Sequence, residues 1–363
     1  MKRVISYSIF AVSMLFLASC GKKTANTVPE PDTETSTAVD AAWATFVVSD
    51  VETQCSFMAE NLLLKHFYTE VPGSAAGSQG TMTATRDISS KALNMAFNKT
   101  HCIDGRLRDG TIFMNYGGYP GFVNPRYQTD SEYGHSYGFN GFGTFSEYRV
   151  DGWKIELADP ANPLRLINTV ANPAFNPSLT PLTWSVQAKV KMTDSTFSKI
   201  IIWEGSLVKT CLNSTSKTTF SATSNHKTDG PVIWDSAMVS YSGMITGQII
   251  DSIRTTSPHT ATIRNFSMKI DEANPIIRDF KCFPNPVAGV VLTATNVVTR
   301  AQAFHPFKKG IASFTVSNTS GEDLYPRQIY FGNEGSPELG DSPCDNTGEI
   351  LIKGVTYKVT FKQ

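Results

Sequence analysis

The feature that most constrains the fold of this chain is a strict alternation of apolar and polar residues. In residues 184–192 (WSVQAKVKM) every second residue is apolar, and residues 355–361 (VTYKVTF) repeat the pattern. Successive side chains of a strand point to opposite faces, so the pattern predicts antiparallel sheet with one face on a core and the other in water. Further strand signals lie at residues 81–86, 111–116, 144–150, 153–157, 199–203, 207–211, 238–250, 260–270, 289–296, 312–317, 328–331 and 349–353.

Short turn signals connect these segments. Asp151-Gly152 separates two strand segments, as in a two-residue hairpin, and Glu204-Gly205 and Lys353-Gly354 are predicted to do the same. The helix candidate covers about residues 57–66. We therefore predict an all-β fold of large antiparallel sheets built from consecutive hairpins, meander or sandwich-like, with one short helix near the N-terminus. A sandwich, a barrel and a long meander all satisfy the pattern.

The charge balance narrows the class of partner. The 363 residues include 32 basic and 32 acidic side chains, so the net charge is zero. Binding to nucleic acid needs a basic excess that neutralises phosphates, and this composition argues against it. Only 18% of the residues are charged, which suits strands and turns more than long solvent-exposed helices.

Residues 1–19 have the layout of a lipoprotein signal peptide. Lys2 and Arg3 precede a mostly apolar run over residues 4–17, which is too short to cross a hydrocarbon core of roughly 30 Å comfortably. The stretch that ends at Cys20 (LASC) resembles a lipobox, the cleavage site of bacterial lipoprotein signal peptidase. Acyl chains such as palmitate on Cys20 would anchor the chain to a membrane, because several chains hold durably where one is marginal. The alternative is an ordinary secretory signal with an incidental cysteine.

Composition also divides the rest of the chain. Residues 20–40 read as the acylated cysteine and a disordered tether, since they carry too little apolar area to fold. An N-terminal β module over residues 41–160 and a C-terminal β module over residues 180–363 are predicted, separated by a proline-rich connection at 158–181. One continuous domain over 41–363 is the alternative. The expected location is the cell envelope, lipid-anchored to the outer membrane on its periplasmic or surface face.

Several segments occur in the order found in a group of uncharacterised lipoproteins from Bacteroidetes-type bacteria. They are residues 102–112 (CIDGRLRDGTI), 148–155 (YRVDGWKI), 241–247 (YSGMITG), 344–346 (CDN) and 348–357 (GEILIKGVTY). The chain resembles this group over most of its body. The resemblance implies a Gram-negative lipoprotein with a β-rich body, and it implies no activity. The chain departs from the group in a long aromatic insert after Gly110 and around residues 301–310.

Five cysteines remain besides Cys20, and an exported protein can join them in disulfides. They are Cys55, Cys102, Cys211, Cys282 and Cys344. The preferred pair is Cys282–Cys344, in the C-terminal strand region, and Cys55–Cys102 is second. Buried reduced cysteines are the alternative. No CxxC pair is present, so the sequence predicts no zinc site.

Titratable residues form no recognisable catalytic motif. The six histidines are scattered, and His101 and Cys102 would point to opposite faces of a strand, so they cannot form a dyad. A glycosidase-type carboxylate pair could in principle come from Asp104, Asp109, Glu147, Asp151 and Glu156. Acids beside glycine usually stabilise turns instead. We assign no catalytic residue, no metal ligand and no cofactor.

Residues 115–148 are the most unusual segment, with ten aromatic residues interleaved with seven glycines. Aromatic rings displayed on glycine-shaped loops can stack on sugar rings or anchor a protein partner. The candidate ligand contacts are Tyr116, Tyr119, Tyr127, Tyr133 and Tyr137. The alternative is a pair of hairpins whose aromatic side chains pack on the sheet.

These observations favour a membrane-anchored envelope lipoprotein that acts as a non-enzymatic binding or structural module. Its partners would be the membrane, through the lipid anchor, and a glycan or protein ligand. A polysaccharide-acting hydrolase and a carrier of an apolar ligand are the alternatives. The hydrolase requires a cleft with two facing carboxylates, and the carrier requires an apolar cavity.

Replacing Cys20 with Ser tests the predicted anchor. The variant is expected to lose acyl-chain labelling and to shift from the membrane to the soluble fraction, because no thiol remains to accept the lipid. Cys211→Ser is the matched control and should keep the label. Unchanged labelling and partitioning of Cys20→Ser would contradict the lipoprotein prediction.

Overall fold

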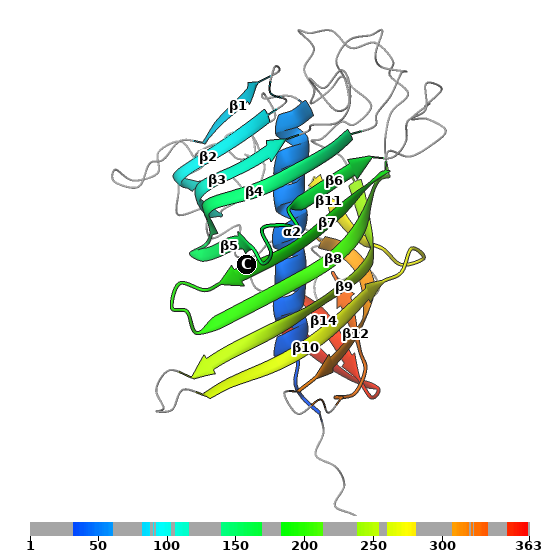
Figure 1. Cartoon of the computed structure of the whole chain (residues 1–363). Coiled ribbons are helices and arrows are strands. Elements are labelled where there is room, and N and C mark those ends of the chain that lie inside the picture. The colour runs from blue at the N-terminus through cyan, green and yellow to red at the C-terminus, as the bar shows by residue number, and fades with distance from the viewer. Residues whose placement is uncertain are drawn as a thin grey trace, which may run out of the picture. The chain divides into compact units, whose positions relative to one another are not determined.

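The strands of the protein form one continuous sheet that accompanies a long helix (Figure 1). The computed structural model describes residues 32–60, 82–87, 90, 92–102, 106–115, 139–168, 183–212, 238–253, 260–280, 307–318, 321, 323–332 and 347–361. The elements are α2 (Ser36–Glu60), β1 (Thr83–Asp87), β2 (Ala92–His101), β3 (Leu107–Asn115), β4 (Phe139–Val150), β5 (Trp153–Leu157), β6 (Leu164–Asn168), β7 (Thr183–Thr193), β8 (Lys199–Cys211), β9 (Met238–Ile253), β10 (Thr260–Ile270), β11 (Ile276–Asp279), β12 (Phe307–Ser317), β13 (Arg327–Phe331), β14 (Thr347–Ile352) and β15 (Val355–Thr360).

Strand order follows the sequence along the main path of the sheet. The path runs β1-β2-β3-β4-β5-β7-β8-β9-β10-β12-β13-β14-β15, with β6 paired to β4 and β7, and β11 paired to β9 and β12. All sixteen pairings between these strands are antiparallel. For the part of the chain that the structure describes, the predicted all-β fold of antiparallel strands with one helix near the N-terminus is therefore confirmed.

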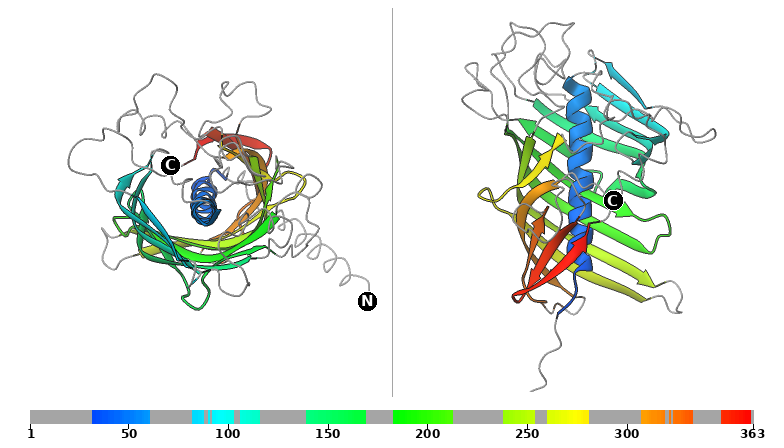
Figure 2. Two further views of the ribbon diagram at one scale, coloured as in Figure 1. Left: turned by 90° about the horizontal axis from the view of Figure 1, so that it is seen from above. Right: turned by 180° about the vertical axis from the view of Figure 1, so that it is seen from behind.

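The sheet curls around α2, so that the helix lies on its concave side (Figure 2). The residues from Glu34 to Gln363 form one compact unit. Within the described residues, no pairing joins β1 to β15, so the two edges of the sheet stay separate. Pairing of β5 and β6 with β7 carries the sheet across the proline-rich connection at 158–181.

Two predicted hairpin turns are confirmed. At Asp151-Gly152 the φ angles are 50° and 84°, and at Lys353-Gly354 they are 51° and 80°. Positive φ at both central residues is the mark of the type I′ turn, whose twist matches that of the flanking strands. The turns join β4 to β5 and β14 to β15, which pair in register directly beside them.

The turn predicted at Glu204-Gly205 is wrong, because β8 runs unbroken through both residues. A Cβ atom at Gly205 would lie 2.9 Å from the Trp203 ring and 3.0 Å from Ile245, so close packing requires glycine here. The proline-rich connection also contains the short strand β6, which the sequence patterns missed. The strand predicted at residues 289–296 lies outside the described residues.

The helix begins about 20 residues before the position predicted for it. The predicted helix covered about residues 57–66, whereas α2 covers Ser36–Glu60, and its first turn lies within the segment predicted as tether. The reason is burial on every side: each residue from Thr37 to Ser56 is buried. A helix enclosed by a sheet has no solvent face, so it lacks the apolar stripe by which amphipathic helices are found.

The carboxylate of Glu34 caps the N-terminal end of α2. Oε1 of Glu34 accepts hydrogen bonds from the backbone amide of Thr37 at 2.9 Å and from the Ser36 hydroxyl at 2.6 Å. These bonds satisfy a backbone amide that has no partner within the helix, and they place negative charge at the positive end of its dipole. Arg327 of β13 is 3.5 Å from Oε2 of Glu34, which ties this end of the helix to the sheet.

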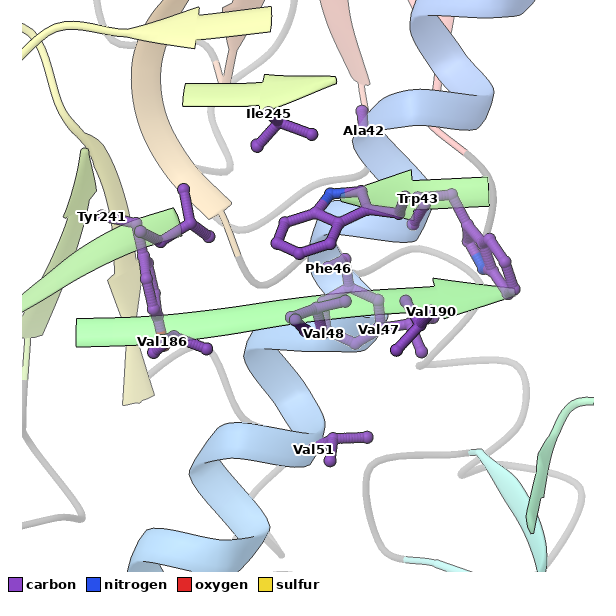
Figure 3. Close-up of a cluster of buried hydrophobic side chains, with 14 of the residues drawn as sticks. Ala42, Trp43, Phe46, Val47, Val48, Val51, Val186, Val190, Tyr241 and Ile245 are labelled. Carbon is purple, nitrogen blue, oxygen red and sulfur yellow. The ribbon is translucent and has the colours of Figure 1, made fainter. Parts of the chain in front are cut away.

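Large side chains of α2 pack against the inner faces of the strands. The Trp43 ring lies 4.6 Å from the Trp153 ring of β5, centroid to centroid. Phe46 lies edge-on to Phe307 of β12 at 6.2 Å. Figure 3 shows Trp43 and Phe46 of the helix in one cluster with Val190 of β7. The helix thus supplies the centre of the hydrophobic core, and the alternating apolar residues of the strands supply its wall.

A close backbone approach at Gly110 bends β3 against β4. The register of this pair shifts between Asp109 and Thr111, and Glu147 opposite has a φ of 48°. Gly110 has a φ of 83°, and a Cβ atom there would lie 2.2 Å from the carbonyl oxygen of Glu147. Only glycine fits such a bulge, because any side chain would collide with backbone.

Two glycine substitutions distinguish the cost of the close backbone contact at Gly110 from the cost of a positive φ angle alone. Gly354 has a φ of 80° but nothing within 4 Å of its Cβ position. Gly354→Ala should therefore cost about 1–2 kcal/mol of unfolding free energy. Gly110→Ala should cost about 3 kcal/mol, since overpacking adds roughly 1–3 kcal/mol. Urea unfolding measures both, and equal losses would contradict the close contact.

Candidate functional site

The first charged cluster of the interior centres on Asp50 of α2. Oδ2 of Asp50 accepts hydrogen bonds from Arg108 at 2.7 Å and from Gln54 at 2.8 Å, and Oδ1 accepts one from Arg278 at 3.2 Å. The three charged side chains are at most 3% exposed. Arg108 lies on β3 and Arg278 on β11, which are far apart in the strand order. Asp50 therefore connects two distant parts of the curled sheet through the helix.

The second cluster centres on Glu52 and faces three consecutive strands. Its Oε2 accepts a hydrogen bond from Lys209 of β8 at 2.7 Å and from Tyr241 of β9 at 3.4 Å, and its Oε1 accepts one from Trp184 of β7 at 2.7 Å. Glu52 and Lys209 have no exposed side-chain surface. The Lys209 ammonium also lies over the Trp184 ring at 4.6 Å, so cation–π attraction offsets part of its desolvation.

The two clusters project to opposite sides of the helix. Each residue turns an α-helix by 100°, so Asp50 and Glu52 point about 200° apart. Burying a charge is costly, and only close partners with several hydrogen bonds offset the cost. A rotation or a one-turn shift of α2 would separate both carboxylates from their partners, so the clusters define one position of the helix in the sheet.

Three further charged residues hold the N-terminal half of the helix. The Lys199 ammonium of β8 lies 2.5 Å from Asp40 of α2 and 3.3 Å from Asp251 of β9. Burial alone would lower the pKa of Lys199, but the two carboxylates raise it on balance. This lysine therefore stays charged and links the helix to two neighbouring strands.

The proton equilibria of the interior favour fixed charges. Burial alone would raise the pKa of Asp50, but Arg108 and Arg278 outweigh that effect and bring it to about 2. Burial opposes ionisation of Glu52 in the same way, and Lys209 lowers its pKa on balance. Burial also raises the pKa of the Cys55 thiol. Both acids are thus ionised near neutral pH with their oxygens engaged, and the thiol is protonated, a poor arrangement for acid–base or nucleophilic catalysis.

A different set of polar residues forms a groove on the outer face of the sheet. The groove has a volume of about 430 Å³, and strands β6 to β9 and the turn before β6 form its walls. Its lining residues are Asn162, Pro163, Arg165, Gln187, Ala188, Lys189, Glu204, Gly205, Ser206, Met244 and Thr246. Lys189 and Glu204 form an ion pair across it at 2.8 Å. This outer-face groove is the described cavity with the richest mixture of charged, amide and hydroxyl side chains.

The binding and anchoring residues predicted from the sequence lie outside the described residues. They are Cys20, the disulfide candidates Cys282 and Cys344, and the five tyrosines Tyr116, Tyr119, Tyr127, Tyr133 and Tyr137. The described end of the aromatic segment divides between the two faces of β4. Tyr148 is buried against the helix side, where its hydroxyl accepts a hydrogen bond from Gln54 at 3.2 Å, whereas Phe142 is half-buried on the outer face.

The candidate carboxylates are held in turns and surface ion pairs. Asp151 accepts hydrogen bonds from Arg106 and from the Leu107 amide, both at 2.8 Å, and Asp109 accepts one from the Lys99 amide at 3.2 Å. Asp104 lies outside the described residues.

The other two candidate acids both form ion pairs with one lysine. Glu147 and Glu156 each lie 2.9 Å from the Lys154 ammonium. Hydrogen bonding to Lys154 is also the main reason that the pKa of Glu147 is lowered. These described carboxylates therefore stabilise the β3–β4–β5 corner of the sheet.

Sequence reasoning missed the buried cations, although they leave a signal. Lys209 stands in β8 at the phase of the alternation that otherwise holds Ile201, Trp203 and Leu207. Arg108 likewise shares its phase in β3 with buried Ile112. A cation at an apolar phase predicts a buried partner of opposite charge, but the partner's identity requires the fold.

The chain matches no protein-family profile, no curated protein and no solved structure. No helix in the described part of the chain has both the length and the apolar character of a membrane span. Among the same residues, no three side chains of His, Cys, Asp or Glu come together as a metal site. The geometry of the two clusters and of the outer-face groove is therefore the basis for assigning a function.

Acid unfolding of wild type and Asp50→Asn tests the first cluster. The pKa of Asp50 is about 2 in the folded protein and about 4 in an unfolded chain. Its contribution is therefore complete above about pH 4 and disappears as the pH falls towards 2. Asp50→Asn should lose about 3–5 kcal/mol at neutral pH and show a flatter profile in this window.

Urea unfolding at a series of pH values measures both effects. Asp271→Asn is the matched control, because the Asp271 side chain is 49% exposed and forms a surface ion pair with Lys269. It should stay close to the wild type. Wild-type stability and acid response in Asp50→Asn would contradict the assigned role.

Proposed function

We propose that this protein is an envelope lipoprotein, anchored through acyl chains on Cys20, whose curled sheet serves as a non-enzymatic binding module. The lipobox-like N-terminus and the resemblance to Bacteroidetes-type lipoproteins support the anchor and the location in the outer membrane. The anchor requires residues 1–20 to act as a lipoprotein signal. The acyl-labelling experiment with Cys20→Ser tests this requirement.

One contrast between the two faces of the sheet carries the binding part of the proposal. On the inner face, Asp50 and Glu52 are paired and hydrogen-bonded to sheet residues. On the outer face, a polar groove of about 430 Å³ presents amide, hydroxyl and charged groups to solvent. An exposed polar groove on a sheet that is held from its inner face supports binding of a hydrophilic ligand, since the backbone of the strands needs little ordering on contact.

The same contrast bears on the two alternative functions. A polysaccharide hydrolase needs two carboxylates across a cleft, and the outer-face groove is lined by the single carboxylate of Glu204, which is paired with Lys189. A carrier of an apolar ligand needs an internal cavity, and α2 occupies the concave side of the sheet with buried residues throughout. We therefore place binding ahead of hydrolysis and of apolar transport.

Binding without turnover is the expected behaviour of the purified mature chain. On an array of polysaccharide fragments and envelope glycans, the protein should retain a subset of glycans. Incubation with each bound glycan should release no new reducing ends, because the outer-face groove is lined by one carboxylate and a glycosidase requires two. Release of reducing ends would contradict the proposal and favour the hydrolase. Failure to retain any glycan would remove glycans from the proposed ligands.

A further inference from the structure

We propose that the outer-face groove binds an acidic oligosaccharide, a sugar chain that carries carboxylates, with Arg165 as the anionic subsite. This inference rests on the proposed binding function and specifies its ligand class and its site. Three properties of the groove lead to it: an uncompensated cation on an aromatic ring, a second cation nearby, and a lining of hydrogen-bonding side chains.

Arg165 is the uncompensated cation. Its guanidinium carbon lies 5.1 Å from the centre of the Phe142 ring on the neighbouring strand β4. Among the described residues, Arg165 makes no ion pair, and its buried Nε has no hydrogen-bond partner. Cation–π attraction holds the guanidinium near this ring, and the planar guanidinium suits a two-oxygen acceptor such as a carboxylate.

The neighbouring strands place further polar groups around this cation. In the register of the sheet, Arg165 lies opposite Phe142 on one side and opposite Gln187 on the other. Lys189 is two residues beyond Gln187 on the same face of β7 and is paired with Glu204. The three charged groups of the groove therefore leave one net positive charge, which favours an anionic ligand.

The remaining lining groups suit hydroxyl-rich ligands. Asn162, Gln187, Ser206 and Thr246 offer amides and hydroxyls that both donate and accept hydrogen bonds. Met244, 49% exposed, continues the groove into a second hollow of about 570 Å³ next to β10. That hollow is lined by one cation and two acids, Lys269, Asp271 and Glu272, so we expect the anionic sugar at Arg165 and an uncharged part of the sugar chain next to β10. From β6 to β10 the two hollows cross five strands, or roughly 19 Å at about 4.8 Å per strand. An extended chain of sugars fits this shape better than a single compact molecule.

The charge pattern disfavours the other anionic partners. Attraction to an anionic lipid surface requires a cluster of about four to eight basic residues, and the groove has two cations and one acid. Nucleic acid likewise requires many phosphate contacts, and the chain has no basic excess. One guanidinium without an ion-pair partner, beside the Lys189–Glu204 pair and uncharged polar groups, matches carboxylates spaced along an otherwise neutral sugar chain.

Isothermal titration of the mature chain with short oligogalacturonates tests the inference, with their methyl esters as the neutral counterpart. The oligogalacturonate should bind, and its methyl ester should bind at least about tenfold more weakly. Added salt should lower the affinity for the oligogalacturonate. Arg165→Gln should reduce the affinity for the acid about ten- to a hundredfold, because a hydrogen bond to a charged group is removed. Arg165→Lys should retain part of the affinity.

Arg149→Gln is the matched control, since Arg149 is also on the outer face, in β4, but is not part of the groove. It should bind like the wild type. Equal binding of acid and ester, or equal loss in both variants, would overturn the inference. The inference would also be overturned if the protein bound neither oligogalacturonates nor oligomannuronates, even if it retained other glycans on the array. Thermal unfolding of each variant checks the fold. If Arg165→Gln unfolds, Arg165→Lys repeats the test, because it keeps the charge but removes the two-nitrogen geometry.

Discussion

The carboxylate of Asp50 between Arg108 and Arg278 is the interaction on which the architecture depends. A curled sheet whose edges do not pair needs a link between its distant parts, and this carboxylate provides one from inside. Such a link is not a large net source of stability, because desolvating three charges consumes much of their attraction. Its value is geometric, since a rotation or a one-turn shift of α2 would separate Asp50 from both arginines.

The alternation of the strands lets one sheet serve two purposes. In β8, Lys209 points inward to Glu52, while the adjacent Val208 is exposed beside the outer hollows. The inner face can therefore be fixed by buried ion pairs while the outer face stays free for recognition. Under the proposal, the Arg165 charge is available to a ligand, whereas the Glu52 charge is buried and paired within the protein.

The sequence was most informative where structure is local. The alternation in β7 and the Asp-Gly turn before β5 depend only on neighbouring residues, so both could be predicted. The helix could not be predicted at its true position, because an enclosed helix shows no amphipathic stripe. Gly205 was predicted to form a turn, because its steric role depends on Ile245 of another strand. The outer-face groove was equally hidden, since Arg165, Gln187 and Thr246 meet only through sheet pairing.

The position of α2 ahead of the described strands has a consequence for biogenesis. The ribosome makes this helix before any of those strands, yet its partners follow much later: Lys209 lies 157 residues beyond Glu52, and Arg278 lies 228 beyond Asp50. Native contacts of such long range slow folding, because the chain must close large loops before it gains from them. The nascent protein must therefore pass a long interval with acidic and apolar helix residues uncovered, a state in which a holding chaperone would protect it from aggregation.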